Sequence, residues 1–200
     1  MIDQKELIDI GAILKKYKRG ELLFKEGDLP RLYYQVHSGK IKMNNYTERG
    51  KEYIQGIFTK GKSFGEPPLF SDFKYPANAE AIIDSEVWEL PKEKFLQLLK
   101  EKPEIHYKFT GALASRLYYK AVMVSEISTQ EPEHRILRIL NYLKKNNPKT
   151  SSQSPDLYEV ELTRQQLADL TGLRVETVIR CIKKLEQKEE LQIKNRKVYL

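Results

Sequence analysis

The sequence has little cysteine and no long apolar run. Its one cysteine, Cys181, excludes a disulfide within the chain and a zinc or iron–sulfur site built from several cysteines. No apolar run reaches the roughly 18 residues that a membrane-spanning helix needs. The N-terminal stretch is acidic where a secretory signal peptide is basic and then apolar. We therefore expect a cytoplasmic protein without a membrane partner.

Positive charge is present in excess and is unevenly distributed. The net charge is +7, and residues 134–200 carry +6 of it, whereas residues 1–133 carry +1. A basic segment joined to a nearly neutral one indicates a polyanion partner for the basic segment. A lysine-rich solvated surface has the same composition, so charge alone leaves both interpretations open.

Glycines and short β-like runs dominate residues 1–102. Seven of the ten glycines fall between Gly20 and Gly65. Strand-like runs cover residues 22–24, 32–36, 40–44, 53–58 and 87–90. Strands at this spacing with glycine turns predict an antiparallel β-roll of the jelly-roll type, in which the strands are not separated by long helices.

Helical spacing of apolar residues predicts three helices outside the strands. The first covers residues 4–16, with Leu7, Ile10 and Leu14 on one face. The second is long and begins at Pro103, a residue suited to a first helical turn. Its apolar stripe consists of Leu113, Leu117, Ala121, Val124 and Ile127. The stripe suits packing against a second copy of the helix, or against the chain's own β-domain.

The third helix begins at Pro132, after a break at residues 128–132, and is stopped by Asn146, Asn147 and Pro148. Residues 148–156 predict an exposed loop, and residues 157–162 a short strand. The chain ends in a predicted hairpin of residues 191–194 and 197–200. We thus expect an α+β chain with a β-roll (1–102), a dimerisation helix (103–129) and a C-terminal domain (130–200).

Residues 163–187 have the pattern of a helix-turn-helix. Thr163 and Gln166 match a capping box, in which each side chain bonds a free amide of the first helical turn. Gly172 follows, where the turn needs a positive φ. The second helix places Val178, Ile182 and Leu185 on its inner face. Two short helices joined by a glycine turn, with a hairpin after them, predict a winged helix-turn-helix.

The outer face of the second helix carries groups that can read DNA. Glu176 and Arg180 are four residues apart, so they project together from its N-terminal half, the part that enters the major groove in this motif. Arginine donates two bonds to guanine, and glutamate accepts one from cytosine. An ordinary surface pair would have the same spacing. Further candidates for DNA contact are Arg174, Thr177, Thr163, Lys183, Lys184 and, on the wing, Arg196.

The whole chain resembles the Crp/Fnr superfamily of bacterial regulators. The resemblance is carried by GELLFKEGDLPRLYYQVHSGKIKM, GKSFGEPPLF, EVWELPKEKF and LTRQQLADLTGLRVETVIRCIKKLEQ, in that order. It implies a homodimer on a near-palindromic double-stranded operator, an effector pocket in the β-roll, and contact with RNA polymerase in members that activate transcription. It also implies that Glu176 and Arg180 read a TGA-like core. Val175 and Ile179 depart from the family's two main branches, so the outer bases of the half-site stay open.

The resemblance places the effector pocket around Gly65 and Glu66. In cAMP-binding members an Arg-Ser pair follows this motif and holds the cyclic phosphate, but here Tyr75 and Pro76 take that place. An unpaired buried phosphate charge costs several kcal/mol. The Thr-Ser pair that reads adenine aligns with Lys120 and Ala121. We therefore expect no tight cAMP binding. The pocket candidates are Gly65, Glu66, Tyr75, Pro76, Ala77, Arg116 and Lys120.

The identity of the effector stays open at this point. The pocket either binds another small molecule, acidic or planar, or is filled by side chains, with control by abundance or a partner. An iron–sulfur cluster of the Fnr type needs four cysteines and is not expected, whereas one histidine would suffice for haem. A cupin-like enzyme needs clustered histidines, and residues 1–102 contain only His37, so we expect no enzyme. A winged helix that binds protein would show no preferred DNA sequence.

Overall fold

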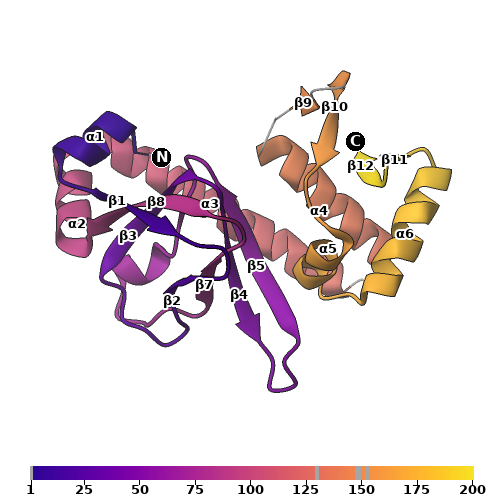
Figure 1. Cartoon of the computed structure of the whole chain (residues 1–200), viewed down its shortest axis with the longest axis horizontal. Helices are drawn as coiled ribbons and strands as arrows, with labels where there is room; N and C mark the ends of the chain where they lie inside the picture. Colours follow the sequence, from indigo (N-terminus) through magenta and orange to yellow (C-terminus); the bar gives the residue numbers. More distant parts are fainter. Residues whose placement is uncertain (1, 129–130, 147–149, 152–153) are drawn as a thin grey trace. The chain divides into compact units, whose positions relative to one another are not determined.

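The computed structural model describes residues 2–128, 131–146, 150–151 and 154–200. The chain forms two compact units, Met1–Leu113 and Ala114–Leu200 (Figure 1). The long helix α3 (Pro103–Ser128) contributes residues to both units and begins at the predicted proline. Within the described residues, no helix is long and apolar enough to cross a membrane.

The first unit is a β-roll of two four-stranded antiparallel sheets, as the glycine and strand spacing predicted. The sheet orders are β1-β8-β3-β6 and β2-β7-β4-β5. The strands are β1 (Ile13–Tyr17), β2 (Leu22–Phe24), β3 (Leu32–Ser38), β4 (Lys40–Tyr46), β5 (Glu52–Thr59), β6 (Ser63–Phe64), β7 (Asn78–Ala81) and β8 (Ser85–Pro91). Besides the start of α3, three helices accompany them, namely α1 (Gln4–Asp9), α2 (Lys92–Glu101) and the short 3-10 helix η1 (Pro67–Phe70). All five predicted runs are strands.

The prediction of a helix over residues 4–16 is wrong beyond Asp9. Helix α1 ends there, and Gly11 turns the backbone with φ +82°. Leu14 then lies in strand β1, opposite Trp88 of β8. The helical spacing of the apolar residues is therefore coincidental, because pairing with a distant strand decides the conformation of residues 13–17.

Alternation along the strands separates two cores in this unit. Tyr34 points into the roll and Tyr33 points to the opposite face, under the helices, and both are at least 95% buried. The inner core contains Tyr17, Phe24, Tyr34, Val36, Ile41, Met43, Phe64, Tyr75, Ala77, Ala79, Ala81 and Val87. The outer core contains Trp88, the chain's one tryptophan, together with Phe95 of α2 and Phe109 of α3.

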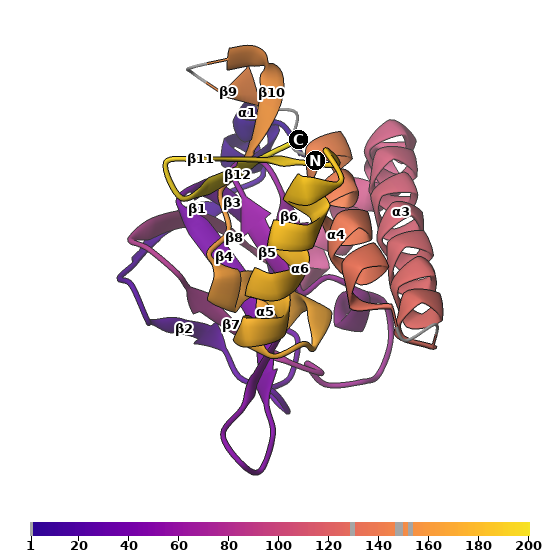
Figure 2. The same cartoon turned by 90° about the vertical axis from the view of Figure 1, so that its right-hand side faces the viewer.

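The second unit combines helices with a four-stranded sheet of order β11-β12-β10-β9. Its elements are α4 (Pro132–Asn146), β9 (Thr150–Ser151), β10 (Ser154–Val160), α5 (Arg164–Thr171), α6 (Val175–Gln187), β11 (Gln192–Lys194) and β12 (Lys197–Tyr199). Helix α4 packs against α5 and α6 (Figure 2). Their shared core includes Ile136, Ile139, Leu140, Leu167, Val178 and Ile182.

The predicted exposed loop over residues 148–156 is wrong in part. Residues 150–151 and 154–156 are in strands, because β10 pairs with β9 on one edge and with β12 on the other. The strand expected over residues 157–162 therefore begins earlier, at Ser154, and ends at Val160. Asn147 and Pro148, expected to stop α4, and the break at residues 129–130 lie outside the described residues.

The apolar stripe of α3 divides along its length. Leu113 packs against the outer core of the first unit, in line with Ile105 and Phe109. Leu117 is 70% exposed, and Ala121 is exposed. The side chains of Val124 and Ile127 lie outside the described ones.

Candidate nucleic-acid interface and the interior of the β-roll

Helix α5 begins with the capping box that the sequence predicted. The Gln166 amide donates to Thr163 Oγ1 at 3.1 Å, and the Thr163 amide donates to Gln166 Oε1 at 2.9 Å. The helix ends at Gly172, whose φ of +70° satisfies the left-handed turn. Arg135 of α4 donates from Nη1 to the carbonyl of Thr171 at 3.1 Å, a contact that local sequence patterns did not indicate. The end of α5, where the turn begins, is therefore held by α4.

Burial of one face fixes the rotation of α6. Val178, Cys181, Ile182 and Leu185 are each at most 4% exposed and pack into the shared core. The Cys181 thiol fills space in this core, and burial raises its pKa. A helix held by these positions presents its remaining faces to solvent.

Glu176 and Arg180 lie on the exposed surface of α6, in the N-terminal half. No ion pair joins their side chains among the described residues, so the surface pair that their spacing allowed is absent. Arg174 is the exposed N-cap residue, and Thr177 is half-buried. Both charged groups are thus accessible to a partner.

The lysines of α6 differ in their surroundings. Lys183 is exposed, but Lys184 Nζ donates to Glu133 Oε1 at 3.0 Å, and Lys188 Nζ donates to Glu133 Oε2 at 2.7 Å. These hydrogen bonds, from Lys188 first, lower the pKa of Glu133. Glu133 lies in the first turn of α4, where a carboxylate also interacts favourably with the helix dipole. Lys184 therefore has an intramolecular partner, which sequence reasoning missed.

The predicted wing is present as the hairpin β11–β12. Its two turn residues, Asn195 and Arg196, have φ of +50° and +65°, as a two-residue hairpin turn requires. The exposed Arg196 is at the tip. Behind it, Lys197 pairs with Glu159 of β10, which also accepts from Tyr199 Oη at 3.1 Å. These bonds tie the wing to the sheet.

Aromatic rings occupy the interior of the β-roll next to the predicted effector residues. Tyr75 is 3% exposed and stacks on Phe24, with ring centroids 3.7 Å apart and planes at 11°. Phe24 also lies 6.3 Å from Phe64 and 5.5 Å from Tyr34. At position 75 the roll therefore presents a stacked phenol ring, and burial raises the pKa of that phenol.

Three of the residues around Tyr75 are also closely packed, whereas Pro76 is exposed. Glu66 and Ala77 are fully buried. Gly65 has φ +69°, and a Cβ there would lie 2.8 Å from Phe24 Cζ, so a larger residue would displace the ring. Pro76 is exposed, and its carbonyl accepts from Asn45 Nδ2 at 2.7 Å. This part of the roll is built around the aromatic stack.

The two remaining pocket candidates belong to the second unit. Tyr119 of α3 stacks on Tyr142 of α4, with centroids 3.6 Å apart. Arg116, one turn away on α3, is close enough to Tyr142 to oppose the rise in its pKa that burial causes. Lys120 has a pKa lowered by desolvation. Within this unit, Arg116 thus lies near Tyr142 of α4.

Comparison with known proteins agrees with both halves of this description. Residues 14–102 match the family model of the cyclic nucleotide-binding domain, and residues 134–200 match that of the Crp-like helix-turn-helix domain. The cAMP-activated global transcriptional regulator CRP of Haemophilus influenzae is 31% identical over 174 residues, covering 86% of this chain and 77% of that protein. The fumarate and nitrate reduction regulatory protein of Vibrio cholerae is 27% identical over 198 residues, covering 98% and 78%.

A solved structure has the same architecture. The c-di-GMP responsive global regulator CLP of Xanthomonas campestris superposes with a TM-score of 0.76 at 25% identity, covering 98% of this chain and 99% of that one. A β-roll joined to a winged helix-turn-helix defines a DNA-binding transcription regulator. The chain belongs to the Crp/Fnr family. The two relatives named above are transcription regulators.

Proposed function

We propose that this regulator binds a near-palindromic operator as a homodimer and reads TGA-like half-site cores with Glu176 and Arg180. The observation that carries the proposal is the pair of exposed side chains on the N-terminal half of α6, neither of them engaged by the other. Arg180 supplies a two-bond contact to guanine, and Glu176 accepts from cytosine. The proposal does not assign the half-site bases outside this core, because Val175 and Ile179 differ from the residues of the family's two main branches.

Phosphate contacts position the helix in the groove. The exposed cations Arg174, Lys183 and Arg196 and the hydroxyls of Thr163 and Thr177 are suited to this role. Lys184 takes part only by leaving Glu133, so its contribution is smaller. This assignment predicts a salt-dependent affinity to which each phosphate contact contributes.

The exposed apolar groups of α3 support the homodimer. Leu117 is 70% exposed and Tyr118 is 74% exposed, on a helix long enough to pair with a copy of itself. In this proposal residues 1–102 form the sensor domain, 103–129 the dimerisation helix and 130–200 the DNA-binding domain. RNA polymerase is the further partner that a bound activator of this type would contact. Leu117→Lys should shift the sedimenting species from dimer to monomer.

The effector is not cAMP in this proposal. Tyr75 places a neutral ring where the cyclic phosphate of a nucleotide needs a cation, and the ring is held by its stack on Phe24. Moving the Tyr75 ring away from Phe24 to admit a nucleotide would lose both the stacking interaction and the burial of the ring. Control by abundance, by a protein partner or by another small molecule is compatible with this interior.

Selection of bound sequences from random DNA by the purified protein tests the operator. An inverted repeat with TGA-like cores is expected, and its half-sites should be about one helical turn apart. The Glu176→Gln, Arg180→Ala double variant is the control and should lose the core. Enrichment of no motif at low salt would contradict the proposal, and would favour a winged helix that binds protein.

A further inference from the structure

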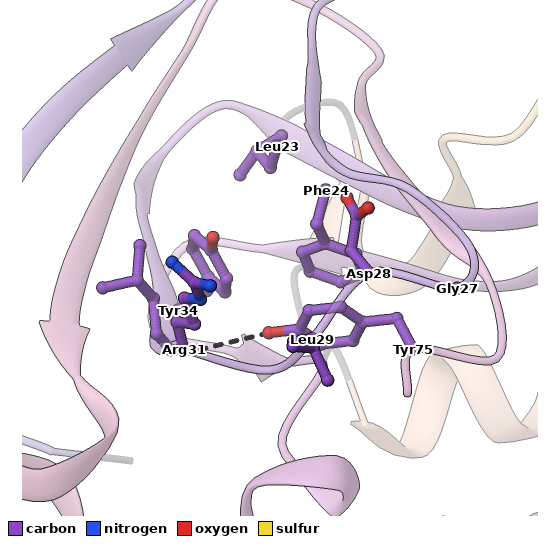
Figure 3. A pocket seen from close by; sticks show the side chains of 9 residues that line it. Leu23, Phe24, Gly27, Asp28, Leu29, Arg31, Tyr34 and Tyr75 are labelled. Atoms are coloured by element: carbon purple, nitrogen blue, oxygen red, sulfur yellow. Dashed lines mark hydrogen bonds between the residues drawn. The ribbon is translucent and has the colours of Figure 1, made fainter. Parts of the chain in front are cut away.

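An opening lies on the β-roll beside the aromatic stack, and Glu66 is not among its lining residues. It has a volume of about 490 Å³, within the range of small-molecule sites. The lining residues are Leu23, Phe24, Gly27, Asp28, Leu29, Arg31, Leu32, Tyr34 and Tyr75. Figure 3 shows Asp28 and Arg31 on opposite sides of the Phe24 and Tyr75 rings. The opening thus combines apolar rings with one charge of each sign.

The two charges do not neutralise each other. Among the described residues, no ion pair or hydrogen bond engages the guanidinium of Arg31, which stands at the exposed end of the loop between β2 and β3. The Asp28 carboxylate accepts one bond, from the Lys25 amide to Oδ2 at 2.8 Å, and its other oxygen is open. Arginine and aspartate in one cavity without a mutual contact leave each able to pair with a ligand.

The Tyr34 hydroxyl adds a neutral hydrogen-bond donor to the opening. The side chain is 5% exposed and lines the opening, yet its hydroxyl has no hydrogen-bond partner within the described part of the chain. Burial raises the pKa of this phenol, so it keeps its proton at neutral pH and can donate. The hydroxyl is not among the fully buried polar atoms without a partner, so it reaches the surface of the opening, where a ligand can accept its hydrogen bond.

The walls of the opening are held in place without a ligand. The Gly27 amide donates to the Tyr75 carbonyl at 2.9 Å, and the Tyr75 amide donates to the Asp28 carbonyl at 3.0 Å. Tyr75 Oη donates weakly to the Leu32 carbonyl at 3.4 Å. A site whose loop is already ordered loses little conformational entropy on binding.

We propose that this opening binds a small zwitterion of the amino-acid class. The ligand carboxylate pairs with Arg31 and accepts from Tyr34 Oη, the ammonium group pairs with Asp28, and an apolar side chain lies against the rings of Phe24 and Tyr75. A cyclic nucleotide has no cationic group for Asp28, and a simple amine leaves Arg31 without a partner. The charges therefore select a molecule that carries both.

Isothermal titration calorimetry without DNA tests this binding separately from the operator proposal. The probes are the proteinogenic L-amino acids, with 3-phenylpropionate and 2-phenylethylamine as analogues of phenylalanine that lack one charge. At least one L-amino acid with an apolar side chain should bind with a Kd of about 10 µM to 1 mM. If phenylalanine is the ligand, the two analogues should bind at least about tenfold more weakly than phenylalanine. If another amino acid binds most tightly, both analogues should bind more weakly than that amino acid.

Variants locate the site. Arg31→Met and Asp28→Asn should each weaken binding about tenfold or more, and the asparagine amide oxygen in the second variant can still accept the Lys25 bond that shapes the loop. The matched controls, Arg49→Met and Asp72→Asn, change exposed residues that do not line the opening and should leave affinity unchanged. The proposal is overturned if no amino acid binds at about 10 mM. Equal affinity in Arg31→Met, or equal binding of a singly charged analogue, would also overturn it.

Discussion

Replacement of Arg180 by alanine separates base reading from every other role of α6. The side chain is exposed and has no ion pair among the described residues, while its neighbours Cys181 and Ile182 hold the helix in the core. Alanine also favours a helix at least as well as arginine. The free energy of unfolding should therefore change by less than about 0.5 kcal/mol.

The expected loss in DNA recognition is much larger. A bidentate contact from arginine to guanine contributes about 1–3 kcal/mol of discrimination against the wrong base. In the proposed symmetric dimer one Arg180 lies on each half-site, so a full operator should lose about 2–6 kcal/mol if the two contributions add. The loss should vanish on an operator in which the contacted guanine of each half-site is already replaced.

Fluorescence anisotropy on the selected operator and on its single-base variants, at several salt concentrations, measures this pattern. Lys183→Ala is the control, because Lys183 is exposed on the same helix and should contact only phosphate. It should weaken all sequences alike and reduce the salt slope by about 0.9 for each phosphate that the variant no longer neutralises. If Arg180→Ala behaves in this way, Arg180 is a phosphate contact and the assignment of base reading is refuted.

Three further outcomes follow from backbone and surface geometry. Gly172→Ala should lower the free energy of unfolding by about 1–2 kcal/mol, because φ is +70° but no atom lies within 4 Å of a new Cβ. Gly39→Ala should lower it further, since the new Cβ would lie 2.7 Å from Ser85 Cα. Equal losses for the two variants in urea denaturation would contradict the steric argument. Thr163→Ala should lower the free energy of unfolding by about 1 kcal/mol, because the capping box is lost. Thr163→Ser keeps the hydroxyl and should retain most of that stability in the same assay. An unchanged stability in Thr163→Ala would show that the cap does not stabilise the fold. Glu133 has a lowered pKa in the folded chain, so its stabilisation is present above the ordinary pKa of glutamate and is lost as the pH falls through the lowered value. Wild type and Glu133→Gln should differ in urea denaturation at neutral pH and converge in acid, and a difference independent of pH would rule out the ion pairs as its source.

Local patterns predicted the elements whose conformation is decided locally. The cap formed by Thr163 and Gln166, and the turn at Gly172, depend on residues three to nine positions apart, so the sequence contains the whole interaction. Strand β1 is different, since Leu14 is held by pairing with Trp88 of a strand more than 70 positions away. The missed strand β9 and the missed start of β10 likewise depend on pairing, since β9 pairs with β10 and β10 also pairs with β12.

The same distinction applies to the sites. Exposure of Glu176 and Arg180 follows from the periodicity of their own helix and was predictable. The ion pairs of Glu133 join residues 51 and 55 positions apart, and no spacing rule indicates them. The opening on the β-roll combines a loop carrying Asp28 and Arg31 with Tyr75, which reaches it only through the folded sheets.

The position of Trp88 makes the two units separately observable. It is the chain's one tryptophan, is 6% exposed in the outer core of the first unit, and meets the His37 ring edge-on with centroids 5.7 Å apart. Its fluorescence therefore reports on the β-roll alone, while far-ultraviolet circular dichroism reports on the helices and strands of both units. Curves from the two probes that do not coincide would identify separate unfolding steps. Stabilisation of the β-roll by a ligand could then be measured in the intact chain, independently of the helix-turn-helix.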